Sequence, residues 1–156
     1  MRKLVIVLLV SMLIVPALTA TAADVTAPIH QFIDSFNKGD ANSAFATYAS
    51  GDIMIVDEFA PFSWSGPNAP RAWAADLEKE MKGEGSTEGQ VKYGAPTRTE
   101  IMGDRAYVIL PTSFVYRLKS KPMVEKGQMT FVLSSQGGDW KIAAWTWTGE
   151  KAHSPK

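Results

Sequence analysis

The segment from Gly39 to Asp57 constrains the fold more than any other part of the chain. Asp40 is a residue type that caps helices, and the residues after it carry apolar side chains at helical spacing. Residues 53–56 (Ile-Met-Ile-Val) are continuously apolar and mostly β-branched, which predicts a buried strand. Because Asp57 follows this strand directly, we expect its carboxylate to lie at the mouth of the cavity that the domain encloses.

Two further helices are expected on either side of this segment. Apolar residues from Ile29 to Phe36 recur at helical spacing, with Thr26 as the expected cap and Pro28 in the first turn, where a missing N–H is tolerated. Asn68 is expected to cap the third helix. The apolar face of that helix carries Trp73, Leu77 and Met81.

The second half of the chain is expected to form antiparallel strands. Turn residues such as Gln136-Gly137-Gly138-Asp139 separate segments rich in β-branched and aromatic residues. Pro111 is expected at a bulge or kink, because proline cannot donate to a strand ladder. The expected strands are residues 91–102, 106–118, 124–134 and 140–148, and the expected loops are residues 59–67 and 82–90.

This order of elements predicts an α+β fold. Helices come first and a run of strands follows, so three N-terminal helices are expected to pack across a curved antiparallel sheet that forms a cone-like half-barrel. The length of 156 residues suits one folded domain, expected over residues 24–150. Residues 151–156 are expected to be a frayed tail.

The first 23 residues have the pattern of a signal peptide. Arg2 and Lys3 precede an apolar run over residues 4–15, and Ala20-Thr21-Ala22 has the small residues of a cleavage site. The run is shorter than the about 20 residues that span a bilayer, although an uncleaved anchor is the alternative. We therefore expect a periplasmic or secreted protein.

The composition excludes several classes of function. Lysine and arginine (16) balance aspartate and glutamate (16) without any basic run, so neither nucleic acid nor, after cleavage, a membrane surface is an expected partner. The absence of cysteine excludes thiol catalysis and Cys-ligated metals. With His30 as the only histidine in the expected domain, no metal site is expected, and nothing in the sequence implies a cofactor.

Several short motifs occur in the order and spacing of a known family. They are Phe36-Asn37-Lys38-Gly39-Asp40, Val56-Asp57, Gly66, and Gly138-Asp139-Trp140-Lys141-Ile142. On these residues the chain resembles the nuclear transport factor 2-like superfamily, which includes ketosteroid isomerases and polyketide cyclase-like (SnoaL-like) proteins. The resemblance implies the α+β fold described above. It does not choose among enzymes, ligand binders and association modules, since the superfamily includes all three.

The resemblance to ketosteroid isomerases implies a role for Asp57. This residue matches the position of their proton-shuttling carboxylate, which would make it a general base. The tyrosine that stabilises the oxyanion in these isomerases is matched by Phe32, which cannot donate a hydrogen bond. Their second oxyanion acid is matched by Val124 or, one residue further, Glu125.

The residues around Asp57 leave alternatives open. A carboxylate in apolar surroundings has a raised pKa and can act as a base near neutral pH. Alternatively, Asp57 caps a loop or pairs with Arg71 or Arg98. Glu58 is adjacent, so on a strand the two side chains would point to opposite faces. His30 is a further acid–base candidate, and the alternative is a partly exposed histidine without such a role.

Aromatic residues on the expected strands predict the cavity wall. Trp145 and Trp147 share a strand face, and Glu125 shares one with Met129 unless Gly127 forms a bulge. The candidate ligand-binding residues are Tyr48, Trp64, Tyr116, Glu125, Met129, Trp145 and Trp147. The alternative is that these side chains fill an ordinary core and the interface of a sheet-mediated homodimer.

Three functions agree with these observations. The first is an exported domain, expected to form a homodimer through its sheet, that binds a small apolar or aromatic molecule in its cavity. The second is a ketosteroid isomerase-like or cyclase- or dehydratase-like enzyme that uses Asp57 as general base. The third is a non-catalytic, dimeric interaction module whose cavity is filled by its own side chains.

Overall fold

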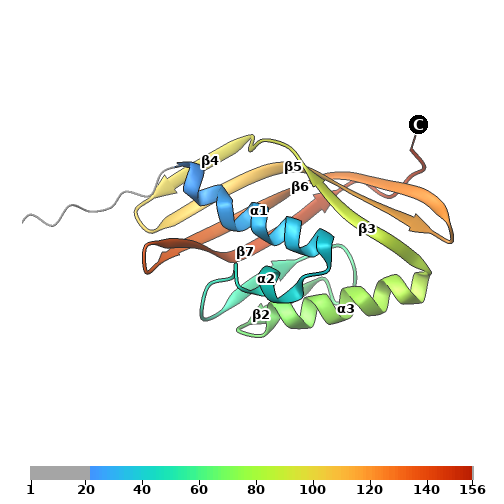
Figure 1. The fold of residues 1–156 in the computed structure, drawn as a ribbon, viewed down its shortest axis with the longest axis horizontal. Coiled ribbons are helices and arrows are strands. Elements are labelled where there is room, and N and C mark those ends of the chain that lie inside the picture. The colour runs from blue at the N-terminus through green and yellow to red at the C-terminus, as the bar shows by residue number, and fades with distance from the viewer. Residues whose placement is uncertain (1–21, 156) are drawn as a thin grey trace, which may run out of the picture.

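The computed structural model describes residues 22–155, and most of the expected signal peptide lies outside this range. Three helices cover one side of a seven-stranded sheet (Figure 1). The helices are α1 (Ala22–Lys38), α2 (Ala41–Phe45) and α3 (Ala69–Glu84). The strands are β1 (Ile53–Val56), β2 (Ser63–Gly66), β3 (Ser86–Tyr93), β4 (Arg98–Met102), β5 (Arg105–Leu118), β6 (Lys121–Gln136) and β7 (Asp139–Gly149). None of the described helices is both long and apolar enough to cross a bilayer.

The sheet has the strand order β2-β1-β7-β6-β5-β3, and β4 pairs with the first half of β5. All pairs are antiparallel except β1 with β7. The sheet is curved and does not close on itself (Figure 1). α1 contacts β7 and β3, whereas α3 contacts β1 and β2 at one edge and β3 at the other. The predicted α+β architecture with three helices across a curved sheet is therefore confirmed.

The buried core lies between α1 and the inner face of the sheet. Ile29 and Ile33 of α1 are almost fully buried, as their helical spacing predicts. Their fully buried partners on the strands are Ile55, Val108, Leu110, Phe131, Leu133 and Ile142. α1 begins at Ala22 rather than at a cap on Thr26, so Pro28 lies inside the helix. Val25, fully buried one turn before Ile29, stabilises this additional turn against the core.

The two expected loops are wrong because strand pairing overrides their composition. In residues 82–90, α3 continues to Glu84, Gly85 caps it in the left-handed conformation (φ 76°), and β3 then pairs with β5. In residues 59–67, Ser63–Gly66 forms β2 against β1. Backbone hydrogen bonds to a neighbouring strand stabilise both segments despite their glycine, proline and polar content.

Two other expectations about the strands are also wrong. Pro111 makes no bulge, because β5 pairs with β6 without a break in register. It lies on β5 between the residues that pair with β4 and those that pair with β3. Its missing N–H therefore removes no hydrogen bond from the sheet. The C-terminal segment does not fray at His153, whose backbone N–H and C=O both bond to Val124 at 3.0 and 2.9 Å.

Candidate functional site

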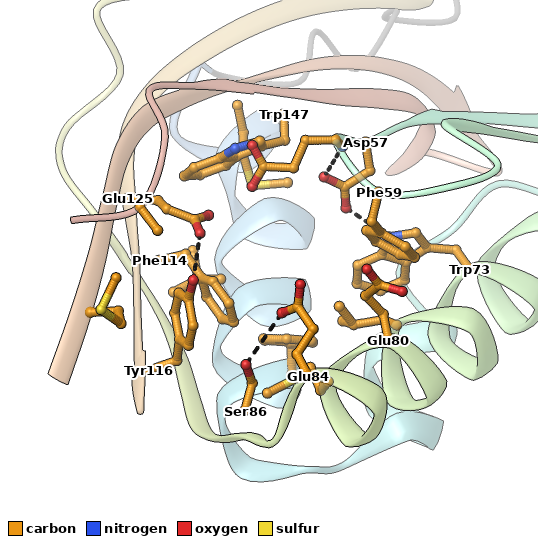
Figure 2. Close-up of a pocket in the computed structure, with 18 of the residues that line it drawn as sticks. Asp57, Phe59, Trp73, Glu80, Glu84, Ser86, Phe114, Tyr116, Glu125 and Trp147 are labelled. Atoms are coloured by element: carbon orange, nitrogen blue, oxygen red, sulfur yellow. Dashed lines mark hydrogen bonds between the residues drawn. The ribbon is translucent and has the colours of Figure 1, made fainter. Parts of the chain in front are cut away.

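A cavity of about 710 Å³ lies between α1, α3 and the inner face of the sheet (Figure 2). Its wall combines nine aromatic side chains with five carboxylates. The aromatic residues are Phe32, Phe36, Phe59, Phe62, Trp73, Phe114, Tyr116, Trp145 and Trp147, and the acids are Asp57, Glu58, Glu80, Glu84 and Glu125. Among the described residues that line the cavity, none is lysine, arginine or histidine.

Asp57 lines this cavity directly after β1, where the sequence placed it. Its Oδ2 accepts a 2.8 Å hydrogen bond from the indole N–H of Trp73, and its Oδ1 accepts one of 2.8 Å from the backbone N–H of Glu58. Burial raises the pKa of the Asp57 carboxyl, and the hydrogen bond from Trp73 opposes that rise. Asp57 is half-buried and has no cationic partner within residues 22–155, and a carboxylate in such a setting is a competent proton acceptor.

The expected arginine partners of Asp57 lie elsewhere. The guanidinium of Arg71 lies 4.5 Å from the ring centre of Phe45, and Arg98 pairs with Glu100 at 3.4 Å. Trp73 takes the place that these arginines were expected to fill. Its indole supplies a neutral donor, which holds the carboxylate in position without neutralising its charge.

Glu58 also lines the cavity, so the expectation that it and Asp57 point to opposite faces is wrong. β1 ends at Val56, and strand alternation does not extend to the two acids that follow it. The pKa of the Glu58 carboxyl is raised to about 8 by burial, by its contact with Glu125 and by the charges of Glu125 and Asp57. The Glu58 carboxyl therefore keeps its proton near neutral pH.

Glu125 stands on the wall opposite α3 and is 9% exposed. Its Oε1 accepts a 2.9 Å hydrogen bond from the hydroxyl of Tyr116 (Figure 2). Burial and the neighbouring carboxylate of Glu125 raise the pKa of Tyr116, which therefore remains a donor. The unbroken β5–β6 register excludes a bulge at Gly127, so Glu125 and Met129 share the inner face, as alternation predicted.

Trp147 lies across two facing glycines on the sheet. Gly127 of β6 pairs with Gly149 of β7, and a Cβ on either would meet an atom of the Trp147 indole at 2.8–3.0 Å. The absence of both side chains lets the indole lie flat against the backbone beside the cavity. There it approaches Glu58 closely enough to lower the pKa of that carboxyl.

Three sequence-predicted residues do not line the cavity. Tyr48 is buried behind it, where its hydroxyl accepts a 2.8 Å hydrogen bond from the indole of Trp145. Trp64 is buried below the loop, where it donates to Asp76 at 2.8 Å and packs against Phe59 at 5.0 Å between ring centres. His30 stacks on Tyr93 at 4.9 Å. Tyr48 and Trp64 therefore hold residues of the cavity wall in place, whereas His30 lies outside the site.

Sequence reasoning did not assign Trp73, Glu80 and Glu84 to the site. All three line the cavity from α3, and Glu84 accepts a 3.4 Å hydrogen bond from the hydroxyl of Ser86 (Figure 2). Helical periodicity could have identified the face of α3 that lines the cavity. Residues 73, 77, 80 and 84 fall on one stripe, so the predicted apolar face of α3 includes two acids.

The β1–β2 loop contributes an aromatic residue in an unusual conformation. Phe62 lines the cavity, is 59% exposed and has a φ of 71°. Its backbone N–H donates to Phe59 at 2.8 Å, and its C=O accepts from the N–H of Asp57 at 3.1 Å. These bonds hold a left-handed residue that carries a large side chain, a combination that stores strain next to Asp57.

No protein-family model and no curated protein matches this chain, but many solved structures do. A type 2 hexachlorocyclohexane dehydrochlorinase (LinA) is 13% identical, with a TM-score of 0.72 over 86% of this chain and 88% of that chain. A ketosteroid isomerase-like protein from Erwinia carotovora atroseptica is 18% identical, with a TM-score of 0.63 over 83% and 96%. A nuclear transport factor 2-like protein from Salmonella enterica serovar Typhimurium is 14% identical, with a TM-score of 0.67 over 83% and 91%.

Identities this low establish the fold and not the activity. The fold of this chain aligns with these structures over most of their length. This chain therefore has the nuclear transport factor 2-like α+β fold that its sequence motifs predicted.

Proposed function

We propose that this protein binds a small, flat molecule with apolar or aromatic surface in the cavity between α1, α3 and the sheet. The observation that carries the proposal is the cavity itself, whose volume of about 710 Å³ falls within the range of ligand pockets, about 300–1,000 Å³. Its aromatic walls offer large flat surfaces, and its few polar groups would orient a ligand.

This proposal is favoured over an interaction module whose cavity is filled by its own side chains. A module of that kind would leave no ligand-sized space. Here a space of about 710 Å³ remains, and two of the aromatic residues that line it, Phe32 and Trp145, contact Tyr48 behind the wall. Binding would therefore need no rearrangement of the core.

The binding test uses the full chain and a neutral aromatic probe, 1-naphthylmethanol. We expect the probe to raise the Tm, and Phe114→Ala to reduce that shift because Phe114 lines the cavity. Tyr107→Ala is the matched control, since Tyr107 lies on the same strand but outside the cavity. Absence of any shift in the wild-type protein would overturn the proposal. Native mass spectrometry of protein purified from its own cells would identify the retained compound.

A second candidate function is proton transfer with Asp57 as general base. It is favoured by the position of Asp57 in the cavity, by its raised pKa and by the absence of a cationic partner for it in the described part of the chain. In a dehydrochlorination, the carboxylate would take a proton from carbon, the C–H electron pair would form a double bond, and chloride would leave.

Asp57→Asn separates the two functions. An enzyme predicts that this variant binds 1-naphthylmethanol as wild type does but releases no chloride from hexachlorocyclohexane. A pure binding protein predicts that neither form releases chloride. The carboxamide still accepts the hydrogen bond from Trp73, so the fold is expected to survive.

We also propose that the protein is exported and forms a homodimer through the outer face of its sheet. Export is supported by the signal-peptide pattern of residues 1–23. Dimerisation is supported by apolar side chains exposed on that face, namely Met54, Val56, Tyr107 and Val132. Analytical ultracentrifugation of the wild type and of Val132→Lys tests the dimer, and a monomeric wild type would exclude it.

A further inference from the structure

The charge on the cavity wall has one sign. Five of the described lining residues are aspartate or glutamate, and none is basic. The acids come from different elements: the β1–β2 loop, α3 and β6. Figure 2 shows Asp57, Glu80, Glu84 and Glu125 around one common space. A ligand with a carboxylate or phosphate would meet repulsion from every side.

Three of these acids accept hydrogen bonds from neutral donors. Asp57 accepts from the Trp73 indole, Glu125 from the Tyr116 hydroxyl and Glu84 from the Ser86 hydroxyl. In residues 22–155, the ion pairs of carboxylates all involve other acids, such as Glu78 and Glu88. Glu125 is buried and Asp57 is half-buried, whereas Glu58, Glu80 and Glu84 are exposed. A carboxylate that is buried without a cation or a proton opposes folding.

Aromatic rings lie beside these carboxylates. Phe114 stacks on Tyr116 at 5.1 Å between ring centres, and Tyr116 in turn bonds to Glu125. The indole of Trp147 lies close to the carboxyl of Glu58. The face of an aromatic ring attracts a cation, and rings combined with carboxylates are the composition of sites for ammonium groups.

We propose that the ligand of this cavity is an organic cation, an aromatic or alkyl amine or a quaternary ammonium, whose charged group lies between Glu58, Glu125 and the Trp147 indole. The inference rests on the proposed small-molecule function and names its ligand class. A metal ion suits the site less well, because no three acidic or histidine side chains among the described residues converge to hold one. Carboxylates spread over several walls suit a larger cation.

A proton competes with this cation. Without a ligand, the Glu58 carboxyl keeps its proton near neutral pH, because burial and the charge of Glu125 raise its pKa. The other titratable groups facing the pair are Asp57, Glu84 and Tyr116, and Tyr116 keeps its proton. A bound cation stabilises the ionised form of Glu58, so it displaces that proton. The affinity for a permanently charged ligand therefore rises with pH.

The test compares three probes that share one ring system and differ in charge. Isothermal titration calorimetry on the full chain would use 1-naphthylmethylamine (cation), 1-naphthylmethanol (neutral) and 1-naphthoate (anion) at pH 7.5. We expect the amine to bind at least about tenfold more tightly than the alcohol, and the naphthoate not to bind. Equal affinity of amine and alcohol would overturn the cation inference while the proposed binding function stands. Binding of none of the three would overturn both.

Matched glutamate-to-glutamine variants test which carboxylates contribute to the affinity for the amine. Glu125→Gln and Glu84→Gln remove a cavity charge, and each is expected to lower amine affinity at least about fivefold without changing alcohol affinity. Glu78→Gln changes the net charge equally on α3 but outside the cavity, so amine affinity is expected to stay at the wild-type value. An equal loss in Glu78→Gln would show a general charge effect and would overturn the site.

A quaternary probe tests the linked proton. Affinity for trimethyl(1-naphthylmethyl)ammonium, which does not titrate, is expected to rise at least about threefold from pH 6 to pH 8.5 in the wild type and less in Glu58→Gln. A flat profile in the wild type would show that no proton is displaced from Glu58 and would contradict the placement of the charge beside Glu58.

Discussion

The cavity has two ends that are built in opposite ways. At one end, the aromatic floor (Phe32 and Trp145 on the wall, Tyr48 and Phe131 behind it) is closely packed, and the indole N–H of Trp145 has its partner in the Tyr48 hydroxyl. The acidic end (Asp57, Glu58, Glu125 and Trp147) gathers like charges that only neutral groups accompany. Folding stability explains the floor. It does not explain the acidic end, where the buried Glu125 and the half-buried Asp57 have no cationic partner among the described residues, and this composition points to a ligand.

The largest loss of stability is expected from a substitution that disrupts the packing of the aromatic floor. In Phe32→Ala, loss of a ring that packs against Tyr48, Phe131 and Trp145 at 5.6, 6.4 and 5.9 Å leaves a void in a close-packed region. The free energy of unfolding is expected to fall by about 3–5 kcal/mol, measured by urea denaturation. Tyr107→Ala, which removes a ring that is 37% exposed, is expected to cost much less. Equal losses would contradict the role of the floor.

A second prediction disturbs the backbone beneath the acidic end. In Gly127→Ala, the added Cβ would meet the carbonyl oxygen of Thr148 at 2.5 Å and the Trp147 indole at 3.0 Å. We expect a loss of about 1–3 kcal/mol and a shift of the Trp147 fluorescence, because the indole must move. Gly83→Ala, a helical glycine with no atom within 4 Å of its added Cβ, is expected to be neutral or slightly stabilising. An unchanged Tm in Gly127→Ala would be the contrary result.

A third prediction uses pH to test the acidic end separately from the aromatic floor. Folding raises the pKa of Glu58, so its contribution to stability is complete below the ordinary value of 4.5 and is lost as pH rises through about 8. Between pH 5 and pH 8, Glu58→Gln is expected to lose about 1 kcal/mol less stability than the wild type. The difference is small because solvent screens an exposed side chain.

Thermal unfolding at both pH values measures this effect, with Glu78→Gln as the control. Lys82 lowers the pKa of Glu78, so the contribution of Glu78 changes only in more acidic solution. The interpretation fails if wild type and Glu58→Gln lose equal stability between pH 5 and pH 8.

The smallest effect on stability is expected at Phe62. In Phe62→Gly, relief of the left-handed strain at φ 71° and the greater chain entropy of glycine oppose each other, so stability is expected to change by less than about 0.5 kcal/mol. Binding of 1-naphthylmethylamine is nevertheless expected to weaken, because an aromatic ring leaves the cavity wall. A large change in Tm together with unchanged affinity would assign Phe62 to the fold instead.

Local patterns were sufficient to predict much of the fold. Helical spacing placed Ile29 and Ile33 in the core, and strand alternation placed Glu125 and Met129 on one inner face. The missed elements, β2 and the start of β3, depend on pairing with distant strands, and their own composition indicates loops. The register of a strand with its partner depends on tertiary structure, which the strand propensity of the segment itself does not encode.

The candidate site could be predicted only in part. The position of Asp57 follows from the end of an apolar strand, but its partner Trp73 lies 16 residues away on a helix whose orientation the sequence leaves open. Tyr48 and Trp64 are aromatic residues near the cavity that turned out to support its wall from behind. Composition identifies such residues as buried, but it does not say on which side of the wall they lie.

The hydrogen bond from Trp73 to Asp57 joins α3 to the end of β1. Because α3 lines the cavity and also contacts β3 at the opposite edge of the sheet, its displacement would widen the cavity. A ligand that bonds to Asp57 competes with Trp73 for the same carboxylate. We therefore expect ligand exchange to depend on local opening of α3, and deuterium uptake by the backbone amides of α3 would measure that opening.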